Sequence, residues 1–161
     1  MIYTNKDEYL QILVEKYSDM VYRLAMSRTK NKEHSEDVYQ EVFLRLVRKL
    51  PEFENENHEK AWLIKVTINC SKDVLGSRWL KNTEELKENL AFSDPEKHDV
   101  YYAVMDLPLK YRTIIHLFYY EGYKIEEISK MLHIKENTIK SQLSRAREKL
   151  KTRMEGGFGD E

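Results

Sequence analysis

The sequence predicts an all-α protein built from two small helical domains that a flexible acidic linker joins. Apolar residues recur at spacings of three and four through most of the chain, which is the periodicity of amphipathic helices. Only five glycines and three prolines occur among 161 residues, too few for the many turns of a sandwich or barrel. A chain of this length fits two domains of about 50 to 80 residues each. The hydrophobic fraction of 41% separates it from disordered sequences.

Charge is divided unevenly along the chain, although the formal net charge is only -1. Residues 1–79 carry 13 basic and 13 acidic side chains, whereas residues 100–155 carry 11 basic and 7 acidic ones. Residues 80–99 between them carry 3 basic and 6 acidic side chains. This pattern favours two modules, of which the basic one is a candidate for binding nucleic acid. Ordinary solvated charges on a helical protein fit the same numbers, so charge alone leaves both interpretations open.

Three helices are expected in the first half. Apolar spacing predicts a helix over residues 7–29 and another over residues 60–75. Between them, Ser35 is the expected N-cap of a helix that runs to about Leu50 and that Pro51 stops. The apolar stripe of this second helix, expected to pack on the first, comprises Val38, Tyr39, Val42, Phe43, Leu46, Val47 and Leu50.

The second half begins after a predicted linker over residues 77–99, within which Leu80, Leu86 and Leu90 suit a short helix. A helix over residues 100–107 is expected next, followed by one with Pro108 as its first residue and Gly122 as its C-terminal cap. The apolar residues expected inside this helix are Ile114, Ile115, Leu117 and Phe118.

A helix-turn-helix is the clearest pattern in the chain. A short amphipathic helix over residues 125–132 is followed by three connecting residues and a second, basic helix whose apolar side comprises Ile139, Leu143, Ala146 and Leu150. Polar residues near the start of that helix share the opposite side and suit contacts with base edges in a major groove. They are Asn137, Lys140, Ser141, Ser144 and Arg145, with Arg147, Lys149 and Lys151 expected along phosphates. A solvated basic helix on a bundle is the alternative, and the short preceding helix and tight turn favour DNA.

The third helix carries a second polar stripe. Lys65, Asn69 and Lys72 follow one another at intervals of four and three, starting one turn after Trp62. A basic stripe beside an aromatic ring suits a single nucleic-acid strand, which it holds by backbone charge and base stacking. Trp62 taken alone is more typical of a core residue. The preceding loop offers further candidates for holding an unstacked base, namely Phe53, Asn55 and Asn57.

The second helix has a charged side opposite its apolar stripe, with Leu44 among the charges. An apolar side chain with a polar rim is typical of the centre of a small protein interface, although single exposed leucines are also common. The residues on this side are Asp37, Gln40, Glu41, Leu44, Arg45 and Arg48.

Enzyme and metal-binding classes find little support. The sequence contains no glycine-rich phosphate loop and no paired-histidine motif, and Cys70 is the only cysteine. We therefore expect no catalytic site, no metal and no cofactor. The apolar runs are short and the first ten residues include Lys6, Asp7 and Glu8, so we expect a cytoplasmic protein without membrane insertion.

Three motifs resemble those of bacterial RNA polymerase sigma factors of the extracytoplasmic-function (ECF) group within the sigma-70 family. They cover nearly the whole chain in the right order and spacing. They are SEDVYQEVFLRLVRKLPEF from Ser35, AWLIKVTINCSKD from Ala61, and LPLKYRTIIHLFYYEGYKIEEISKMLHIKENTIKSQLSRAREKL from Leu107. The resemblance implies a sigma2 domain over residues 1–76 and a sigma4 helix-turn-helix domain over residues 100–155.

The resemblance also implies roles for the polar residues and for their partners. The implied partners are promoter DNA, the beta-prime clamp helices and beta flap of core RNA polymerase, and an anti-sigma factor. Docking on the clamp helices is implied for Asp37, Gln40, Glu41, Phe43 and Leu44. Contacts to the minus-ten element are implied for Phe53, Asn55, Asn57, Trp62, Lys65 and Asn69. Contacts to the minus-thirty-five element are implied for Asn137, Thr138, Lys140, Ser141, Ser144, Arg145 and Arg147.

Two other functions fit the residues without the resemblance. A two-domain regulator would bind operator DNA tightly without polymerase. A helical adaptor would use the basic helix to bind an acidic protein and would leave no footprint on DNA. The sequence departs from the resembling family at His133, Lys135 and Asn137, in and just after the turn of the helix-turn-helix.

Overall fold

The fold was analysed in a computed structural model, which describes residues 5–78 and 99–158. These residues are helical with connecting turns, and no strand occurs among them. The chain divides into two compact units, Met1–Asn89 and Leu90–Glu161. The prediction of an all-α protein with two helical domains is confirmed. Much of the predicted linker, including the short helix expected around Leu80, Leu86 and Leu90, lies outside the described residues.

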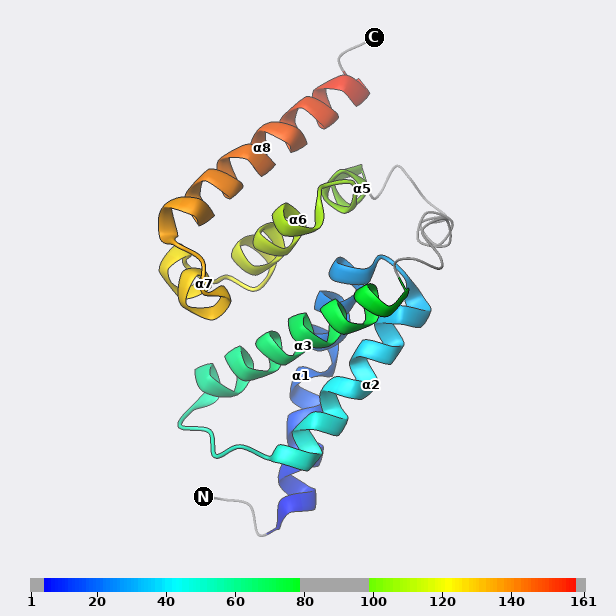
Figure 1. The fold of residues 1–161 in the computed structure, drawn as a ribbon, viewed down its shortest axis with the longest axis vertical. Helices are drawn as coiled ribbons and strands as arrows, with labels where there is room; N and C mark the ends of the chain where they lie inside the picture. The colour runs from blue at the N-terminus through cyan, green and yellow to red at the C-terminus, as the bar shows by residue number, and fades with distance from the viewer. Residues whose placement is uncertain (1–4, 79–98, 159–161) are drawn as a thin grey trace. The chain divides into compact units, whose positions relative to one another are not determined.

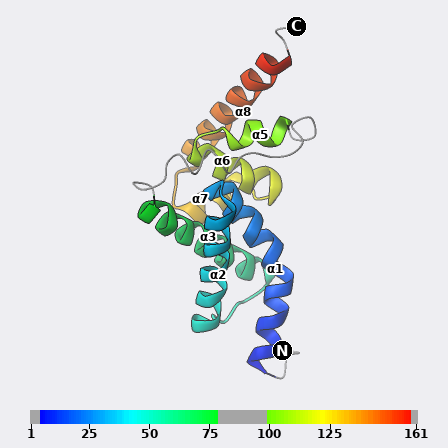
Figure 2. The same ribbon diagram turned by 90° about the vertical axis from the view of Figure 1, so that its right-hand side faces the viewer.

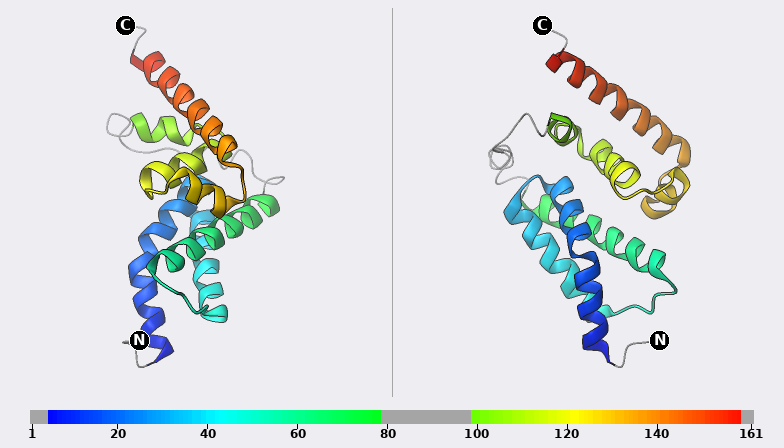
Figure 3. Two further views of the ribbon diagram at one scale, coloured as in Figure 1. Left: turned by 90° about the vertical axis from the view of Figure 1, so that its left-hand side faces the viewer. Right: turned by 180° about the vertical axis from the view of Figure 1, so that it is seen from behind.

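The first unit is a bundle of α1 (Lys6–Thr29), α2 (Lys32–Lys49) and α3 (Glu56–Arg78). In both views of Figure 3, α1 and α2 run alongside each other and α3 lies across them. Each helix packs on the other two, so their apolar stripes meet in one core. The fully buried side chains at its centre include Leu13, Val21, Leu24, Val38, Leu46, Leu63 and Ile64.

Asparagines cap the first two helices. The side-chain oxygen of Asn5 accepts the backbone N–H of Glu8 at 2.7 Å, and that of Asn31 accepts the N–H of His34 at 2.8 Å. The prediction that Ser35 caps α2 is wrong, because Ser35 lies inside the helix. Its hydroxyl is buried and bonds the carbonyl of Asn31 at 2.7 Å and the hydroxyl of Thr29 at the same distance.

The C-cap residues of α1 and α2 both have the left-handed backbone conformation. Lys30 has φ of 58° and its N–H donates to the carbonyl of Met26, while Leu50 has φ of 30° and donates to Leu46. These bonds satisfy carbonyls that a helix end otherwise leaves without partners. The helix therefore ends at Lys49, directly before Leu50 and the Pro51 that was expected to stop it.

The bounds of α3 and the exposure of Val47 also differ from the prediction. Helix α3 begins at Glu56 rather than near residue 60 and runs through Gly76 to Arg78. Val47, expected in the stripe that packs on α1, is 54% exposed. Phe43 of the same stripe is buried, with its ring centroid 4.9 Å from that of Tyr39.

The second unit contains α5 (Asp99–Met105), α6 (Leu109–Ile115), η1 (His116–Tyr120), α7 (Ile125–Leu132) and α8 (Glu136–Phe158). Helices α5, α6 and α7 all contact α8, which is the long helix that ends near the C-terminus in Figures 1 and 2. The buried side chains of this unit include Leu107, Ile114, Ile115, Leu117, Ile128, Ile139, Leu143 and Ala146.

A π-helical turn, η1, continues α6 where the sequence predicted ordinary helix. Nε2 of His116, the first residue of η1, lies 3.0 Å from Oε2 of Glu121, the residue directly after the turn, and both side chains are buried. The turn is followed by Gly122 at φ of 74°, a conformation that glycine adopts without strain. Phe118, expected inside, is only half-buried, and Tyr119 and Tyr120 are exposed.

Candidate functional site

The helix-turn-helix is formed by α7, the turn at residues 133–135, and α8. His133 takes the left-handed conformation with φ of 57°, and its N–H donates to the carbonyl of Ser129. The N–H of Ile134 donates to the same carbonyl at 3.1 Å, and the Ser129 hydroxyl donates to the carbonyl of Ile134. At the other end of α7, Glu127 accepts the backbone N–H of Lys124 at 2.8 Å. These bonds fix the direction in which α8 leaves the turn.

The first half of α8 has an apolar side and a polar side. Ile139, Leu143 and Ala146 are fully buried against the rest of the unit. The predicted base-reading side chains are all exposed, and no hydrogen bond or ion pair engages them within the part of the chain that the structure describes. They are Asn137, Thr138, Lys140, Ser141, Ser144 and Arg145.

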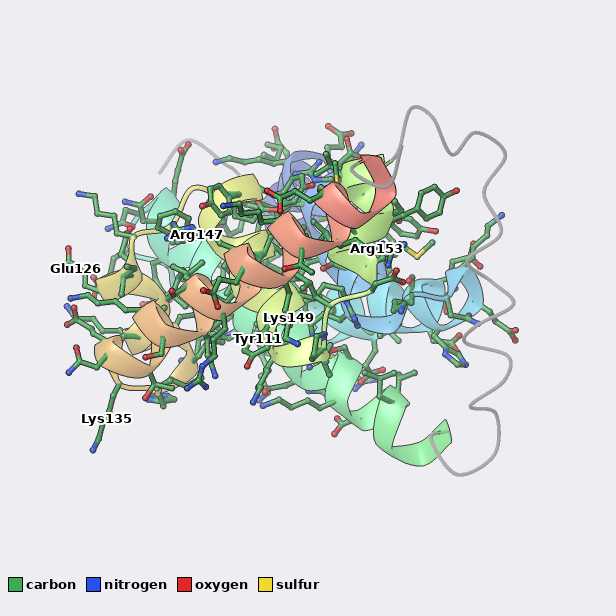
Figure 4. All side chains as sticks on the ribbon, turned by 90° about the horizontal axis from the view of Figure 1, so that it is seen from above. Tyr111, Glu126, Lys135, Arg147, Lys149 and Arg153 are labelled. Atoms are coloured by element: carbon green, nitrogen blue, oxygen red, sulfur yellow. The ribbon has the colours of Figure 1, made fainter. Side chains whose placement is uncertain are left out.

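Basic residues continue along α8 beyond this polar side. Figure 4 shows Arg147, Lys149 and Arg153 along the helix and Lys135 extending away from the turn before it. Arg153 forms an ion pair with Asp106, which follows α5. The guanidinium of Arg147 lies against the aromatic rings of η1, so the structure gives it an intramolecular contact in addition to the phosphate role predicted for it.

In the first unit, α3 presents the second polar stripe. Lys65, Asn69 and Lys72 are exposed, and no hydrogen bond or ion pair engages them within residues 5–78. Trp62, one turn earlier, is half-buried. The structure therefore presents the lysines and Asn69 to solvent as the helical spacing predicted.

The loop before α3 contains an aromatic contact and a cap. The ring of Phe53 lies edge-on to Trp62 at 5.8 Å and to His58 at 5.2 Å between centroids. Asn55 accepts the N–H of His58 at 2.9 Å and thereby caps α3, so its side-chain oxygen already has a partner. Asn57 is exposed. The sequence placed His58 at the end of this loop without a role of its own, and its contacts with Glu54 and Phe53 are seen only in the structure.

The outer side of α2 carries an exposed apolar pair. Leu44 is 48% exposed and Val47 is 54% exposed, three residues further along the helix. Beside them Gln40 is exposed, and Glu41 bonds Arg45 at 3.2 Å and lies 3.7 Å from Arg48. Val47 was missed because it was assigned to the packed stripe. The remaining predicted docking residues differ in exposure, since Asp37 is half-buried and Phe43 is buried.

The described residues hold no group of three or more His, Cys, Asp or Glu side chains that could bind a metal ion. Burial raises the pKa of the Cys70 thiol to about 11, which keeps it protonated and unreactive near neutral pH. None of the helices in residues 5–78 and 99–158 is long and apolar enough to cross a membrane.

Comparisons with known proteins place both units in one family. Residues 13–81 match the family model described as sigma-70 region 2, and residues 97–150 match that described as sigma-70, region 4. The chain is 32% identical over 132 residues to RNA polymerase sigma factor SigV of Bacillus subtilis, with 78% of each protein covered. It is 30% identical over 152 residues to ECF RNA polymerase sigma factor SigE of Mycolicibacterium smegmatis, covering 86% of this chain but 59% of SigE.

A solved structure shares the fold. The sigma factor RpoE, in complex with the anti-sigma factor NepR from Bartonella quintana, matches with a TM-score of 0.71 at 20% identity. The match covers 93% of this chain and 98% of that chain. At this identity the comparison shows a shared arrangement of helices.

Proposed function

This chain belongs to the extracytoplasmic-function group of the sigma-70 family of transcription-initiation factors, and we propose that it binds core RNA polymerase and directs it to specific promoters. The proposed sigma2 domain comprises residues 1–76, with α3 continuing two residues further to Arg78, the proposed linker residues 77–99 and the proposed sigma4 domain residues 100–155. The observation that carries the proposal is the polar side of α8, which is exposed and has no partners within the described part of the chain. The polymerase performs the chemistry, and this chain supplies recognition.

The sigma4 domain reads the minus-thirty-five element in this proposal. The first half of a recognition helix contacts base edges in the major groove, where Arg and Lys pair with guanine and Asn with adenine. Lys140 and Arg145 supply such cations, and Asn137 supplies the amide. Basic side chains further along α8, such as Lys149, contact phosphates and fix the register of the helix without reading sequence.

The sigma2 domain melts and holds the minus-ten element. Lys65 attracts the strand backbone, while Trp62 and Phe53 provide aromatic surface on which an extruded base stacks. Asn57 and Asn69 are available for hydrogen bonds to that base. Asn55 contributes by capping α3 and holding the shape of the loop, because its side-chain oxygen bonds the N–H of His58.

The α2 pair of Leu44 and Val47 is the proposed centre of the surface that docks on the beta-prime clamp helices. Exposed apolar side chains with a polar rim suit such an interface, and Gln40 and Glu41 form part of the rim. Phe43 supports this surface from inside the bundle. The sigma4 domain engages the beta flap in the same complex.

The small net charge of the protein supports the proposal that it binds promoter DNA only together with polymerase. A net charge of -1 leaves the whole chain little general attraction for DNA, because nonspecific affinity comes from neutralised phosphates. Two recognition domains held on one enzyme raise each other's effective concentration at a promoter and supply the missing affinity. Free protein would therefore bind DNA weakly, and the holoenzyme would bind it tightly.

An anti-sigma factor is a further proposed partner. The structurally similar RpoE was solved in complex with the anti-sigma factor NepR. A protein that covers the α2 pair or the polar side of α8 would block polymerase or promoter binding by this chain.

The test is transcription from a duplex library in which both promoter elements are randomised. The purified full chain is mixed with core RNA polymerase from the bacterium that encodes it, and the RNA products are sequenced. We expect enrichment of templates with two conserved elements at one spacing. Transcripts without such enrichment, or tight operator binding without polymerase, would contradict the proposal.

A further inference from the structure

The first turn of α3 connects two different parts of the sigma2 domain. On one side, its acidic residues Glu56 and Glu59 meet side chains of α1. On the other side, His58 bonds Glu54 of the loop of residues 51–55, and Trp62 in the next turn packs on Phe53 of the same loop. Any change in how α1 holds this turn is therefore passed to the loop.

Glu59 is the centre of the α1 contact. Its Oε1 accepts the hydroxyl of Tyr17 at 2.8 Å and lies 3.5 Å from Lys16 Nζ, while its Oε2 accepts the hydroxyl of Tyr9 at 3.0 Å. The Glu59 side chain is only 12% exposed. A carboxylate accepts hydrogen bonds more strongly than a neutral group, and one that is largely out of water depends on those donors. Glu59 thus attaches the start of α3 to two tyrosines of α1.

The loop has no other attachment of this kind. Within the described residues, the hydrogen bonds of residues 51–55 all go to His58 and Glu59. Glu54 N–H donates to His58 Nδ1 at 3.1 Å, and Asn55 accepts the backbone N–H groups of His58 at 2.9 Å and Glu59 at 3.1 Å. The ring of Phe53 packs edge-on against His58. The hydrogen bonds of the loop therefore connect it to the first turn of α3, and the ring of Phe53 also packs on Trp62 in the next turn.

We infer that Glu59 is a positioning residue for promoter melting: bonded by Tyr9 and Tyr17, it fixes the first turn of α3 and, through His58, the loop that holds the extruded minus-ten base. This inference rests on the proposed function. Glu59 itself is turned toward α1 and touches no DNA. Its role is to keep Phe53 and the loop backbone in place, so that the base enters a preformed site.

The test compares one promoter from the library in two forms, a full duplex and a template whose minus-ten region is already unpaired. With the full chain and core polymerase, Glu59→Ala should lower initiation on the duplex about tenfold, less than the roughly hundredfold that a misplacement of about 1 Å can cost. On the pre-melted template the loss should be below twofold, because the cost of opening has been removed. A fall in the folded fraction would reduce both templates equally.

Glu56→Ala is the matched control. It removes an acid from the same turn, but the Glu56 side chain is 80% exposed, and within the described residues its carboxylate pairs only with Lys16, at 2.8 Å. We expect no template-dependent defect from this variant. Glu59→Gln keeps one carbonyl oxygen and adds an amide that can donate to a tyrosine hydroxyl, so it should recover most of the duplex activity.

Should Glu59→Ala fail to fold, the double variant Tyr9→Phe with Tyr17→Phe removes the donors and keeps both rings. It should show the same preference for the pre-melted template. Equal losses on both templates, or none on either, would overturn the inference and leave the proposed function standing. Absence of transcription by the wild-type chain on both forms would overturn the two together.

Discussion

The guanidinium of Arg147 donates from Nε to the hydroxyl of Tyr119 at 2.6 Å, and its carbon lies 5.6 Å from the ring centroids of both Phe118 and Tyr119. This contact joins the middle of the recognition helix to the π-helical turn η1. Arg145, two residues earlier, has no such contact in the described domain. Neighbouring arginines on one helix therefore have different surroundings.

Replacing these arginines should separate stability from sequence recognition. Arg147→Ala loses a cation–π contact of about 0.5–1 kcal/mol and a hydrogen bond of about 1 kcal/mol, so the sigma4 domain should become about 1–2 kcal/mol less stable. Thermal denaturation measures this change. Arg145→Ala should leave stability within about 0.5 kcal/mol and instead cost about 1–3 kcal/mol at one base pair of the minus-thirty-five element. Library transcription would show the relaxed preference, and a stability loss confined to Arg145→Ala would contradict the assignment.

An acidic side chain at Leu44 should weaken polymerase binding. Leu44→Asp places a charge at the centre of the proposed docking surface, where loss of a major apolar contact costs about 2 kcal/mol or more. Affinity for core RNA polymerase should fall at least about thirtyfold, since 1.4 kcal/mol corresponds to about a factor of ten. Val100→Asp is a matched control, because Val100 is 57% exposed on the other domain. Equal losses from both variants would place the docking surface elsewhere.

The third prediction concerns Asn69 and promoter opening. Asn69→Ala removes an exposed amide that has no partner within residues 5–78, so the fold should be unaffected. Loss of one contact of about 1 kcal/mol to the extruded base should lower the open fraction severalfold. Run-off transcription should therefore fall more on duplex than on pre-melted template. Wild-type activity on both would remove Asn69 from the melting surface.

Alkaline pH should weaken the contact between Tyr17 and Glu59. Burial, with the hydrogen bond to the Glu59 carboxylate, raises the pKa of Tyr17 to about 12. The unfolded chain has a tyrosine pKa near 10, so the folded state holds the proton more tightly. This stabilisation is complete below about pH 10 and is lost as the pH rises toward 12. Tyr17→Phe should cost about 1.5–3 kcal/mol at pH 8, and the difference from wild type in urea denaturation should shrink above pH 10. A constant difference across that range would show that the hydroxyl proton is not involved.

Limited proteolysis tests the domain boundaries. The acidic composition of residues 80–99 and the division of the chain into two compact units both support independent folding of the two halves. Cleavage between Gly76 and Asp99 should leave two resistant fragments, which mass spectrometry would identify. A single resistant core that spans those residues would contradict the two-domain boundaries.

The sequence predicted those elements whose signals are local. Helix α7 has the expected bounds, because its apolar spacing is bordered by polar residues and its N-terminal turn is acidic. The polar side of α8 was predicted in the same way, as the side opposite the apolar positions, of which Ile139, Leu143 and Ala146 are buried and Leu150 is half-buried. Most helices and their buried faces were therefore predictable from periodicity. Exceptions are Val47, which is exposed, and Phe118, which is only half-buried.

The errors arise where particular hydrogen bonds and contacts, local or distant, decide the structure. Ser35 and Asn31 are both good N-caps by residue type. The structure shows that Asn31 takes the role, because it accepts the N–H of His34 while the Ser35 hydroxyl is buried against Thr29. Glu59 belongs to a polar stretch without apolar periodicity, and its partners Tyr9 and Tyr17 are more than 40 residues away. The π turn is a single turn of five residues that continues α6, and the sequence pattern did not distinguish it from ordinary helix.

In the part of the chain that the structure describes, three helices end at a residue other than glycine in the left-handed conformation, namely Lys30, Leu50 and His133. Each such residue costs roughly 1–2 kcal/mol, whereas glycine would add an entropic penalty of about 0.5–1 kcal/mol in the unfolded chain. The free energy of unfolding is therefore lower than it would be with glycine at these three positions, all of which lie outside the proposed contact residues. Selection maintains only the stability that function requires. Glycine at these three helix ends would raise the free energy of unfolding, so the protein could become more thermostable there without changing the residues proposed to recognise DNA and polymerase.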